Sequence, residues 1–212
     1  MSTLSSNSPF YCAHCLQCRL PTSHCVCAQI KQCDAPFSIM ICSHRNEWHK
    51  IHNTGHWAFL SSPAIKRIQW HRKTELIDWG RANNPLAVFD KTDSEKNNFN
   101  KTDYLLFPSA EAQDIQQLQT SIERLWVIDG TWQEAQKMLR QSPWLQNLPQ
   151  VKIAAVADSQ SAFVLRRNQQ GLSTLEAISA AIAKNSDAGA RCAEALDANF
   201  ELFQNALLHL KR

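Results

Sequence analysis

Short apolar runs alternate with longer stretches of mixed polarity along most of the chain. Runs rich in β-branched and aromatic residues occur at 37–42, 86–89, 104–107, 125–128 and 151–156, and apolar runs of this length predict buried strands. Several of the intervening stretches have helical spacing. Strands that alternate with helices predict an α/β fold, in which helices cover both faces of a mostly parallel sheet.

The last part of the chain carries a regular apolar stripe. Leu196, Phe200, Phe203, Leu207 and Leu210 follow one another in steps of four and three residues, a spacing that places them on one face of an α-helix. We expect a long C-terminal helix whose apolar face packs against the core and takes no part in chemistry.

One apolar run ends at an acidic residue and leads into a predicted helix. The fourth of the runs above is followed directly by Asp129, and the carboxyl end of a parallel strand is where α/β sheets place their ligands. Thr131 and Glu134, three residues apart, then match the capping box of a helix over 131–140. Capping explains Thr131 and Glu134. It leaves Asp129 and Trp132 unexplained, which makes them candidates for function.

A second helix start repeats this pattern after a glycine. Ser173 and Glu176 match a capping box, and the next apolar residues, Leu175, Ile178 and Ile182, predict a buried stripe. Helix N-termini carry free N–H groups and a partial positive charge, so these two N-termini could bind an anionic group such as a carboxylate. Most capped helices bind nothing, so the pattern alone only suggests a site.

The composition fits a folded protein that stays inside the cell. A chain of 212 residues, 44% of them hydrophobic, can bury the core of one domain with an appendage or of two small domains. No apolar run approaches the length of a transmembrane helix, and residues 1–9 lack the basic start of a signal peptide. We therefore expect a soluble, cytoplasmic protein.

The charge of the chain permits nucleic-acid binding without requiring it. The formal net charge is +3 and the pI is about 8.4, which is only mildly basic. Basic residues gather at 45–50, at 66–81, and at Arg166 and Arg167. For most of them a solvated surface is the simpler interpretation.

A dense group of cysteines near the N-terminus predicts a metal site. The chain has eight cysteines but no secretory signal, and the reducing cytosol argues against a disulfide framework. Cys15 and Cys18 form a CxxC pair. Cys25 and Cys27 form a CxC pair. Two such pairs can aim four thiolates at one tetrahedral zinc ion, whereas reduced free thiols are the alternative and a redox pair is less favoured.

Other potential ligands lie close to this group. Cys12 and His14 could each replace one of the four cysteines. A shell closed by four protein ligands leaves no position for water, so we expect the site to be structural and not catalytic. The remaining cysteines, Cys33, Cys42 and Cys192, are scattered along the chain and are expected to be small buried residues.

A short signature and five further motifs resemble the DTW-domain family, which is named for an Asp-Thr-Trp signature. The signature occurs here as Asp129, Thr131 and Trp132 within VIDGTW. The other motifs are the cysteine group with its Arg-Leu-Pro insert, SHRNE at 43–47, HNTG at 52–55, LLFPS at 105–109 and LSTLEA at 172–177. Each motif is weak alone, but together and in this order they cover most of the chain.

The resemblance implies a tRNA-uridine aminocarboxypropyltransferase. Such an enzyme moves the 3-amino-3-carboxypropyl group of S-adenosylmethionine to N3 of a uridine and releases methylthioadenosine. The resemblance also implies a fold similar to that of SPOUT RNA methyltransferases, whose sheets contain a trefoil knot that periodicity alone does not predict. Together with the polar start of the chain and the cysteine group, it gives a disordered lead (1–11), a zinc-binding knuckle (12–35) and a DTW catalytic domain with a C-terminal amphipathic helix (36–212). We expect the protein to bind tRNA and to bind neither DNA nor a membrane. We expect it to be a monomer or a homodimer.

The matching positions imply the site residues. Asp129 is the candidate general base for the uridine proton, and Trp132 is expected to stack on adenine or on the flipped uridine, or else to pack against the sheet. The implied cofactor-binding residues are Phe107, Pro108, Ser109, Asp129, Gly130, Thr131, Trp132, Ser173, Thr174 and Glu176. The residues implied to bind RNA, or to shape the pocket, are His44, Arg45, Asn53, Thr54, Arg166 and Arg167.

Two other functions remain open at this point. The first keeps S-adenosylmethionine but transfers its methyl group, so the protein would be an RNA methyltransferase. The second is a zinc-knuckle RNA-binding protein without enzymatic activity, in which the helix caps are only caps. The mass of the product separates the two transferases, and calorimetry with S-adenosylmethionine separates both from the binding protein.

Overall fold

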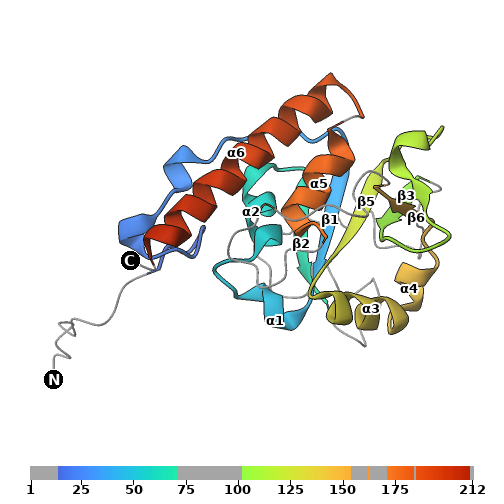
Figure 1. Ribbon diagram of the computed structural model, residues 1–212, viewed down its shortest axis with the longest axis horizontal. Coiled ribbons are helices and arrows are strands. Elements are labelled where there is room, and N and C mark those ends of the chain that lie inside the picture. The colour runs from blue at the N-terminus through green and yellow to red at the C-terminus, as the bar shows by residue number, and fades with distance from the viewer. Residues whose placement is uncertain (1–13, 71–101, 154–161, 163–170, 184, 211–212) are drawn as a thin grey trace, which may run out of the picture.

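A single parallel sheet forms the centre of the molecule (Figure 1). The structure is a computed structural model, which describes residues 14–70, 102–153, 162, 171–183 and 185–210. Within them six strands, all paired in parallel, lie in the order β2-β1-β5-β3-β6-β4. The strands are β1 (Ser38–Ser43), β2 (Ile65–Gln69), β3 (Asp103–Leu106), β4 (Gln113–Asp114), β5 (Arg124–Asp129) and β6 (Gln150–Lys152).

Most of the predicted strands are confirmed. The runs at 37–42, 104–107 and 125–128 correspond to β1, β3 and β5, and the last run begins as β6. The run at 86–89 lies outside the described residues. The sequence did not predict β2, because Lys66 and Arg67 interrupt its apolar residues, and it did not predict the two-residue β4.

Helices cover both faces of the sheet, as predicted. The longer ones are α2 (Thr54–Ser61), α3 (Trp132–Arg140), α5 (Thr174–Ile182) and α6 (Asp187–His209). The shorter ones are α1 (Arg45–Trp48), α4 (Pro143–Gln146) and the 3-10 turns η1 (Thr22–His24), η2 (Cys27–Gln29) and η5 (Ile115–Gln117). Among the described residues no helix is long and apolar enough to cross a membrane.

Alternate residues of the central strands enter two separate hydrophobic cores. Ile39 of β1 and Leu125 of β5 face the core that α2, α5 and α6 cover, and these three helices lie together on one side of the sheet (Figure 1). Met40 and Trp126, the next residue on each strand, face the smaller core beneath α3 and α4. The alternation is the one that a pleated strand buried on both faces requires.

Helix α2 lies inside the larger core, and the hydrophobic pattern did not reveal it. Seven of its eight residues are buried, so the helix has no polar face and therefore no amphipathic stripe. Trp57 is 0% exposed and stacks on Phe203 of α6 with ring centroids 4.8 Å apart. The predicted C-terminal helix is confirmed as α6, since Leu196, Phe200, Phe203 and Leu207 are all buried.

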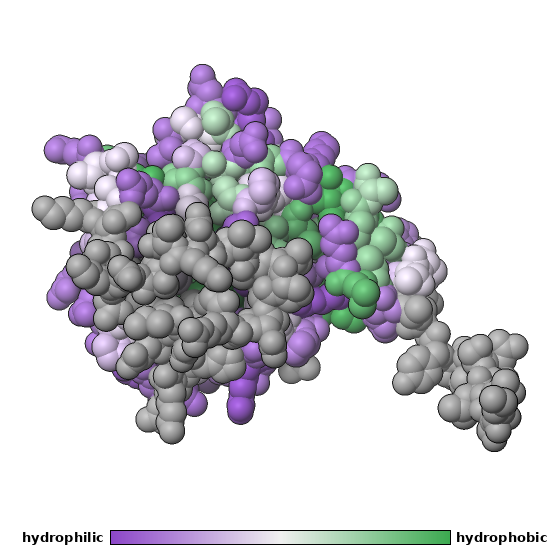
Figure 2. All heavy atoms as spheres, turned by 180° about the vertical axis from the view of Figure 1, so that it is seen from behind, coloured by the Kyte–Doolittle hydropathy of each residue, from purple (hydrophilic) through white to green (hydrophobic). Residues whose placement is uncertain are grey.

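The cysteine knuckle packs into the same core as these helices. Leu20, which follows Cys18 by two residues, is 0% exposed and belongs to the larger core together with Val26. Apolar side chains also reach the surface on the face that Figure 2 shows. Within the knuckle, Leu16 is 100% exposed. The knuckle therefore buries part of its apolar surface against the α/β domain.

One expectation about the cysteines is wrong. Cys33 and Cys192 are joined in a disulfide across 159 residues, whereas both were expected to be unpaired. Asn199 of α6 explains how the two segments meet, because its side chain accepts from Lys31 N at 2.9 Å and donates to Lys31 O at 2.8 Å. No local spacing reveals such a pair. Cys42 is a buried free thiol, as expected.

The packing of α5 against α6 depends on one glycine. A Cβ atom on Gly189 would lie 2.2 Å from the carbonyl oxygen of Ile182, which is far inside van der Waals contact. We predict that Gly189→Ala lowers the free energy of unfolding by about 1–3 kcal/mol, because overpacking outweighs the better helix propensity of alanine.

Chemical denaturation of the two proteins measures this loss. Glu194→Ala, an exposed substitution on the same helix, is the control and should change stability by less than about 0.5 kcal/mol. Equal stability of Gly189→Ala and the unmodified protein would contradict the close helix contact.

Candidate active site and metal centre

Asp129 lies buried at the carboxyl end of β5, at the centre of a hydrogen-bond network. It is 3% exposed. Its Oδ2 accepts from Ser43 Oγ at 2.7 Å and from Asn53 Nδ2 at 3.0 Å. Its Oδ1 accepts from Thr174 Oγ1 at 2.8 Å. The three donors belong to β1, to the start of α2 and to the start of α5, so one carboxylate joins three elements.

Arg67 supplies the positive charge that balances this buried carboxylate. Arg67 is 3% exposed. Its Nη2 lies 3.5 Å from Asp129 Oδ2, and its Nε donates to Ser43 Oγ at 2.8 Å. Burial lowers the pKa of Arg67 to about 10, and the negative charge of Asp129 opposes that change. Because a buried ion needs a partner and filled hydrogen bonds, Asp129 and Arg67 depend on each other.

The start of α2 is pressed against Asp129. Asn53 caps the helix by accepting from His56 N at 2.7 Å and uses its amide nitrogen to bind Asp129. A Cβ atom on Gly55 would lie 3.0 Å from the carboxylate carbon of Asp129, so only glycine lets the helix approach this closely. Helix N-termini favour a nearby negative charge, and Asp129 lies against one.

The start of α3 is tied to the end of β1. The predicted capping box is present: Thr131 N donates to Glu134 Oε2 at 2.9 Å, and the Thr131 side chain accepts from Glu134 N. Glu134 Oε1 accepts from Asn46 Nδ2 at 2.9 Å and lies 3.1 Å from His44 Nδ1. Burial acts to raise the pKa of Glu134, but the hydrogen bonds from Thr131 and Asn46 outweigh it and lower the pKa.

An exposed tryptophan stacks on a buried phenylalanine at the same edge. Trp132 is 52% exposed, and its ring stacks on that of Phe107 with centroids 5.4 Å apart and an interplanar angle of 11°. Phe107 follows β3 directly, so the stack lies at the same edge of the sheet as Asp129, the last residue of β5. An exposed indole on a fixed support offers a flat face on which a base can stack.

The second predicted cap is also present and reaches Asp129. Ser173 accepts from Glu176 N, and Glu176 Oε2 accepts from Ser173 N at 2.8 Å. The LSTLEA motif thereby brings Thr174 to Asp129, 45 residues earlier in the chain. Ser109 lies in the loop after β3, where its Oγ is buried and has no hydrogen-bond partner among the described residues.

The residues expected to bind RNA or shape the pocket divide into two groups. His44, Asn53 and Thr54 are buried, and the first two make the contacts given above. Arg45 is exposed at the start of α1. Arg166 and Arg167 lie outside the described residues. Of this set, Arg45 is the described side chain that is accessible to a large partner.

A small cavity lies between the knuckle and α2, and Arg67, which lines it, also contacts Asp129. Arg19, Trp48, His56 and Arg67 are among its lining residues, and its volume is about 140 Å³. Pockets that enclose ligands of drug or cofactor size measure roughly 300–1,000 Å³. The cavity is too small for S-adenosylmethionine, so we do not assign the donor to it.

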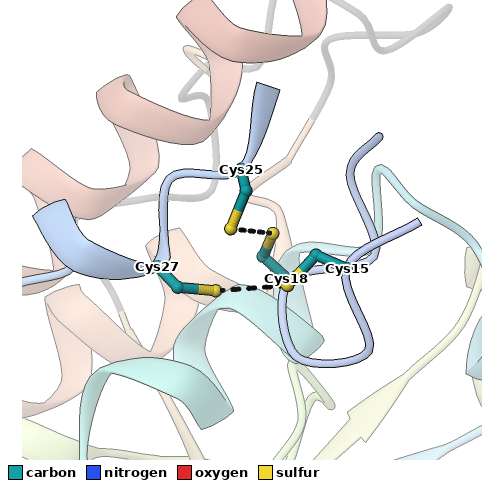
Figure 3. Close-up of side chains that lie close together, drawn as sticks. All are labelled: Cys15, Cys18, Cys25 and Cys27. Carbon is teal, nitrogen blue, oxygen red and sulfur yellow. Dashed lines mark hydrogen bonds between the residues drawn. The ribbon is translucent and has the colours of Figure 1, made fainter. Parts of the chain in front are cut away.

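The four cysteines predicted to bind zinc converge on one point (Figure 3). Their sulfur atoms all lie within 4.8 Å of one another. Cys15 Sγ is 3.6 Å from Cys27 Sγ, and Cys18 Sγ is 3.8 Å from Cys25 Sγ. Zinc–sulfur bonds of about 2.3 Å at tetrahedral angles put sulfur atoms about 3.8 Å apart. The arrangement therefore fits a structural zinc ion.

The surroundings of the sulfurs also suit a bound cation. Backbone N–H groups of Cys18 and Gln17 lower the pKa of Cys15 to about 6, whereas burial raises the pKa of Cys18 and of Cys27. A divalent ion compensates the burial of thiolates, which are the form that binds metal. His14 is not a member of the group, and Cys12 lies outside the described residues.

Comparison with protein families accounts for this combination of a knuckle and a sheet edge. The family model described as the DTW domain matches residues 12–208. The chain belongs to the DTW-domain family. This is the family of tRNA-uridine aminocarboxypropyltransferases, so the DTW domain points to tRNA modification. Comparisons with curated proteins and with solved structures gave no match.

The three signature residues of the DTW domain have three different surroundings. Asp129 is buried in the hydrogen-bond network. Thr131 caps α3. The intervening Gly130 lies against the first turn of this helix, since a Cβ atom added to Gly130 would lie 3.2 Å from Glu134 Cβ. Trp132 is exposed and stacked on Phe107. Capping thus explains the threonine, while the tryptophan presents an exposed aromatic ring.

Sequence reasoning missed two members of the DTW-domain site. Ser43 was part of a quoted motif but was not named as a site residue, and it donates to Asp129 and accepts from Arg67. Arg67 was counted only among surface basic residues. Its position offered a signal, because a charged residue between Ile65 and Ile68 of an apolar run needs a buried partner.

The metal site gives a direct prediction. We expect the purified protein to contain about one zinc ion per chain, and Cys18→Ser to lose most of it, because three thiolates do not complete the shell. The variant should also unfold at a lower temperature, since metal binding energy is folding energy in such sites. Metal analysis and thermal unfolding measure both effects.

Cys42→Ala is the control for this experiment. Cys42 is a buried free cysteine outside the group of four, so this variant should keep its zinc. Full zinc content in Cys18→Ser would show that the four sulfurs do not form the site.

Proposed function

We propose that the protein transfers the 3-amino-3-carboxypropyl group of S-adenosylmethionine to N3 of a uridine in tRNA. Membership of the DTW-domain family supports this reaction. The observation that carries it in the structure is the meeting of VIDGTW and LSTLEA at one sheet edge, through the hydrogen bond from Thr174 Oγ1 to Asp129 Oδ1. Ligands bind at this edge of parallel sheets.

The reaction is a single displacement at carbon. Uridine N3 attacks the γ-carbon of the methionine part, the bond from that carbon to sulfur breaks, and the sulfur keeps the electron pair. The products are the alkylated uridine and methylthioadenosine, and the N3 proton is lost. Because methyl transfer from the same sulfonium competes, the site must hold the amino-acid arm, and not the methyl group, in line with N3.

The donor is proposed to bind along the edge between β3, β5 and α5. Trp132 offers a stacking face, and the N-termini of α3 and α5 offer N–H groups and positive dipole ends to the carboxylate of the methionine arm. The full set proposed to surround the donor is Phe107, Pro108, Ser109, Asp129, Gly130, Thr131, Trp132, Ser173, Thr174 and Glu176. Ser109 Oγ, which has no hydrogen-bond partner among the described residues, is proposed to bond to the donor.

Asp129 is proposed to position this site, in place of the general base suggested by the sequence. An ionised carboxylate offers about four lone-pair directions, and Asp129 accepts from Ser43, Asn53, Thr174 and Arg67. A base must have a lone pair free for the incoming proton. Asp129 instead fixes the starts of α2 and α5 relative to β5.

His44 is proposed as the acceptor of the uridine proton. It follows Ser43 at the end of β1, its backbone N–H donates to Asp129 O at 2.8 Å, and its Nδ1 lies 3.1 Å from Glu134 Oε1. Its Nδ1 accepts from Asn46 N at 3.3 Å as the N-cap of α1, so the neutral ring carries its hydrogen on Nε2. A proton taken up at Nδ1 is stabilised by the neighbouring Glu134 carboxylate.

RNA is proposed to approach from the exposed side of this edge. Arg45, Arg166 and Arg167 are the proposed phosphate contacts, while Asn53 and Thr54 are proposed to shape the pocket from within. The zinc knuckle is proposed to be structural. We also propose a SPOUT-like fold with a trefoil knot, and a chain divided into a lead before residue 12, the knuckle from residue 12 and the catalytic domain from residue 36. The protein is proposed to be cytoplasmic, to be a monomer or a homodimer, and to have no affinity for DNA.

Mass spectrometry tests the reaction itself. Unmodified tRNA incubated with the protein and S-adenosylmethionine should gain the mass of an aminocarboxypropyl group on one or more uridines, and methylthioadenosine should appear in equal amount. Gain of a methyl group with S-adenosylhomocysteine would identify a methyltransferase. Absence of any product, together with no calorimetric heat from S-adenosylmethionine, would leave an RNA-binding protein.

Two variants separate the proposed roles of His44 and Asp129. His44→Gln should lower kcat about 10²–10⁴-fold and abolish the pH dependence that reports the base, because proton transfer contributes effects of this size. Thr174→Val removes one donor from Asp129 and should instead raise KM for S-adenosylmethionine while leaving the pH profile in place. Steady-state kinetics across a pH series distinguishes them.

Asp129→Asn tests whether Asp129, and not His44, is the base. It should resemble Thr174→Val in its pH profile and also lose about 3–5 kcal/mol of stability, because Arg67 is left buried without its counter-charge. If folded Asp129→Asn loses the pH dependence while His44→Gln keeps it, Asp129 is the base and the assignment to His44 is wrong.

A further inference from the structure

Arg19 occupies an unusual backbone conformation in the knuckle. Its φ is +65°, the left-handed region that favours glycine and that side chains with a Cβ seldom adopt. The residue follows the metal-binding Cys18 directly, and its N–H donates to Cys15 O at 2.8 Å. A glycine would satisfy this turn without strain, so the long side chain at this position requires an explanation outside the turn.

The side chain of Arg19 leaves the knuckle and binds the end of α1. Its Nη1 donates to the backbone carbonyl of Trp48. The same carbonyl accepts from Arg67 Nη1 at 3.1 Å, and the Arg67 guanidinium lies over the Trp48 ring, 4.6 Å from its centroid. One carbonyl oxygen therefore joins an arginine of the knuckle to the arginine that balances Asp129.

Arg67 carries this connection into the active-site network. Besides Trp48, its Nη2 donates to Glu47 O at 3.1 Å and lies 3.5 Å from Asp129 Oδ2, and its Nε donates to Ser43 Oγ. The planar guanidinium thus contacts the α1 turn, the end of β1 and the Asp129 carboxylate at the same time. A lysine has the charge but not this fork of donors.

A second contact runs in parallel from the knuckle to α2. His56 Nε2 lies 2.8 Å from Gln17 O. Burial lowers the pKa of His56 to about 3, and the charges of Arg19 and Arg67 add to this effect, so the ring is neutral and donates its Nε2 hydrogen. His56 lies in the first turn of the helix whose cap, Asn53, binds Asp129.

We propose that Arg19 and Arg67 are positioning residues, which couple the metal-held knuckle to the donors around Asp129. The metal fixes the turn that carries Arg19, Arg19 and Arg67 together hold the Trp48 carbonyl, and Arg67 holds the carboxylate. The effect on group transfer rests on the proposed function, whereas the structural coupling does not. The simpler alternative is that Arg19 only fastens the knuckle to the domain.

Arg19→Gly distinguishes the two, because glycine removes the side chain and also suits the left-handed turn. We expect unchanged zinc content and an unchanged or higher melting temperature. Amide hydrogen exchange over residues 43–56 should accelerate, and kcat/KM for transfer to tRNA should fall about 10–100-fold, the range expected of a small misplacement of reacting groups. Ala28→Gly, an exposed position of the knuckle, is the matched control and should change none of these.

Arg67→Lys gives a second and independent measurement. It should accelerate exchange over residues 43–56 and lower kcat/KM to a similar degree, with zinc content unchanged, because the charge remains but the fork is lost. Unchanged exchange and kinetics in Arg19→Gly would overturn the coupling, as would a fall in zinc content or melting temperature large enough to account for lost activity. If the unmodified protein transfers nothing to tRNA, the proposed function fails, and exchange alone decides the coupling.

Discussion

The buried charge of Asp129 is the constraint on which the arrangement of this sheet edge depends. A carboxylate removed from water is stable only if hydrogen-bond donors and a counter-charge replace its hydration. Here those groups come from different elements: Ser43 from β1, Arg67 from β2, Asn53 from the start of α2 and Thr174 from the start of α5. Displacing any of these elements would leave a buried charge unsatisfied, so the carboxylate fixes their relative positions.

The same constraint explains why the three signature residues are so different physically. Asp129 is committed to the interior, and Thr131 completes a helix cap. Trp132, one residue further, is half exposed and supported by Phe107. A rigid, charged interior thus carries an aromatic surface, which is the combination expected where a flat ligand is held in a defined orientation. The polar residues of the site are largely occupied with one another, and the surface presented to a ligand is aromatic and backbone N–H.

The knuckle belongs to this arrangement and is not a separate attachment. Its Leu20 lies in the main core, His56 of α2 binds its backbone, and Arg19 reaches the carbonyl that Arg67 also holds. Four sulfurs at the separations of a tetrahedral metal shell would make the turn that bears Arg19 rigid. A structural metal can in this way influence a site that it does not touch, because each link is a direct contact between ordered groups.

Local patterns of the sequence determined the elements of this protein, and long-range partners determined its site. The runs of β1 and β5, both capping boxes, the stripe of α6 and the cysteine spacing were predictable, because each depends on residues a few positions apart. Helix α2 was not, since burial on every side erases its pattern. Arg67 and the Cys33–Cys192 pair were not either, because their partners lie 62 and 159 residues away. Only the folded chain decides which charges and thiols meet: burial makes a counter-charge for Arg67 obligatory but leaves no local trace of which residue supplies it, and two cysteines meet only where the packing of α6 brings them together.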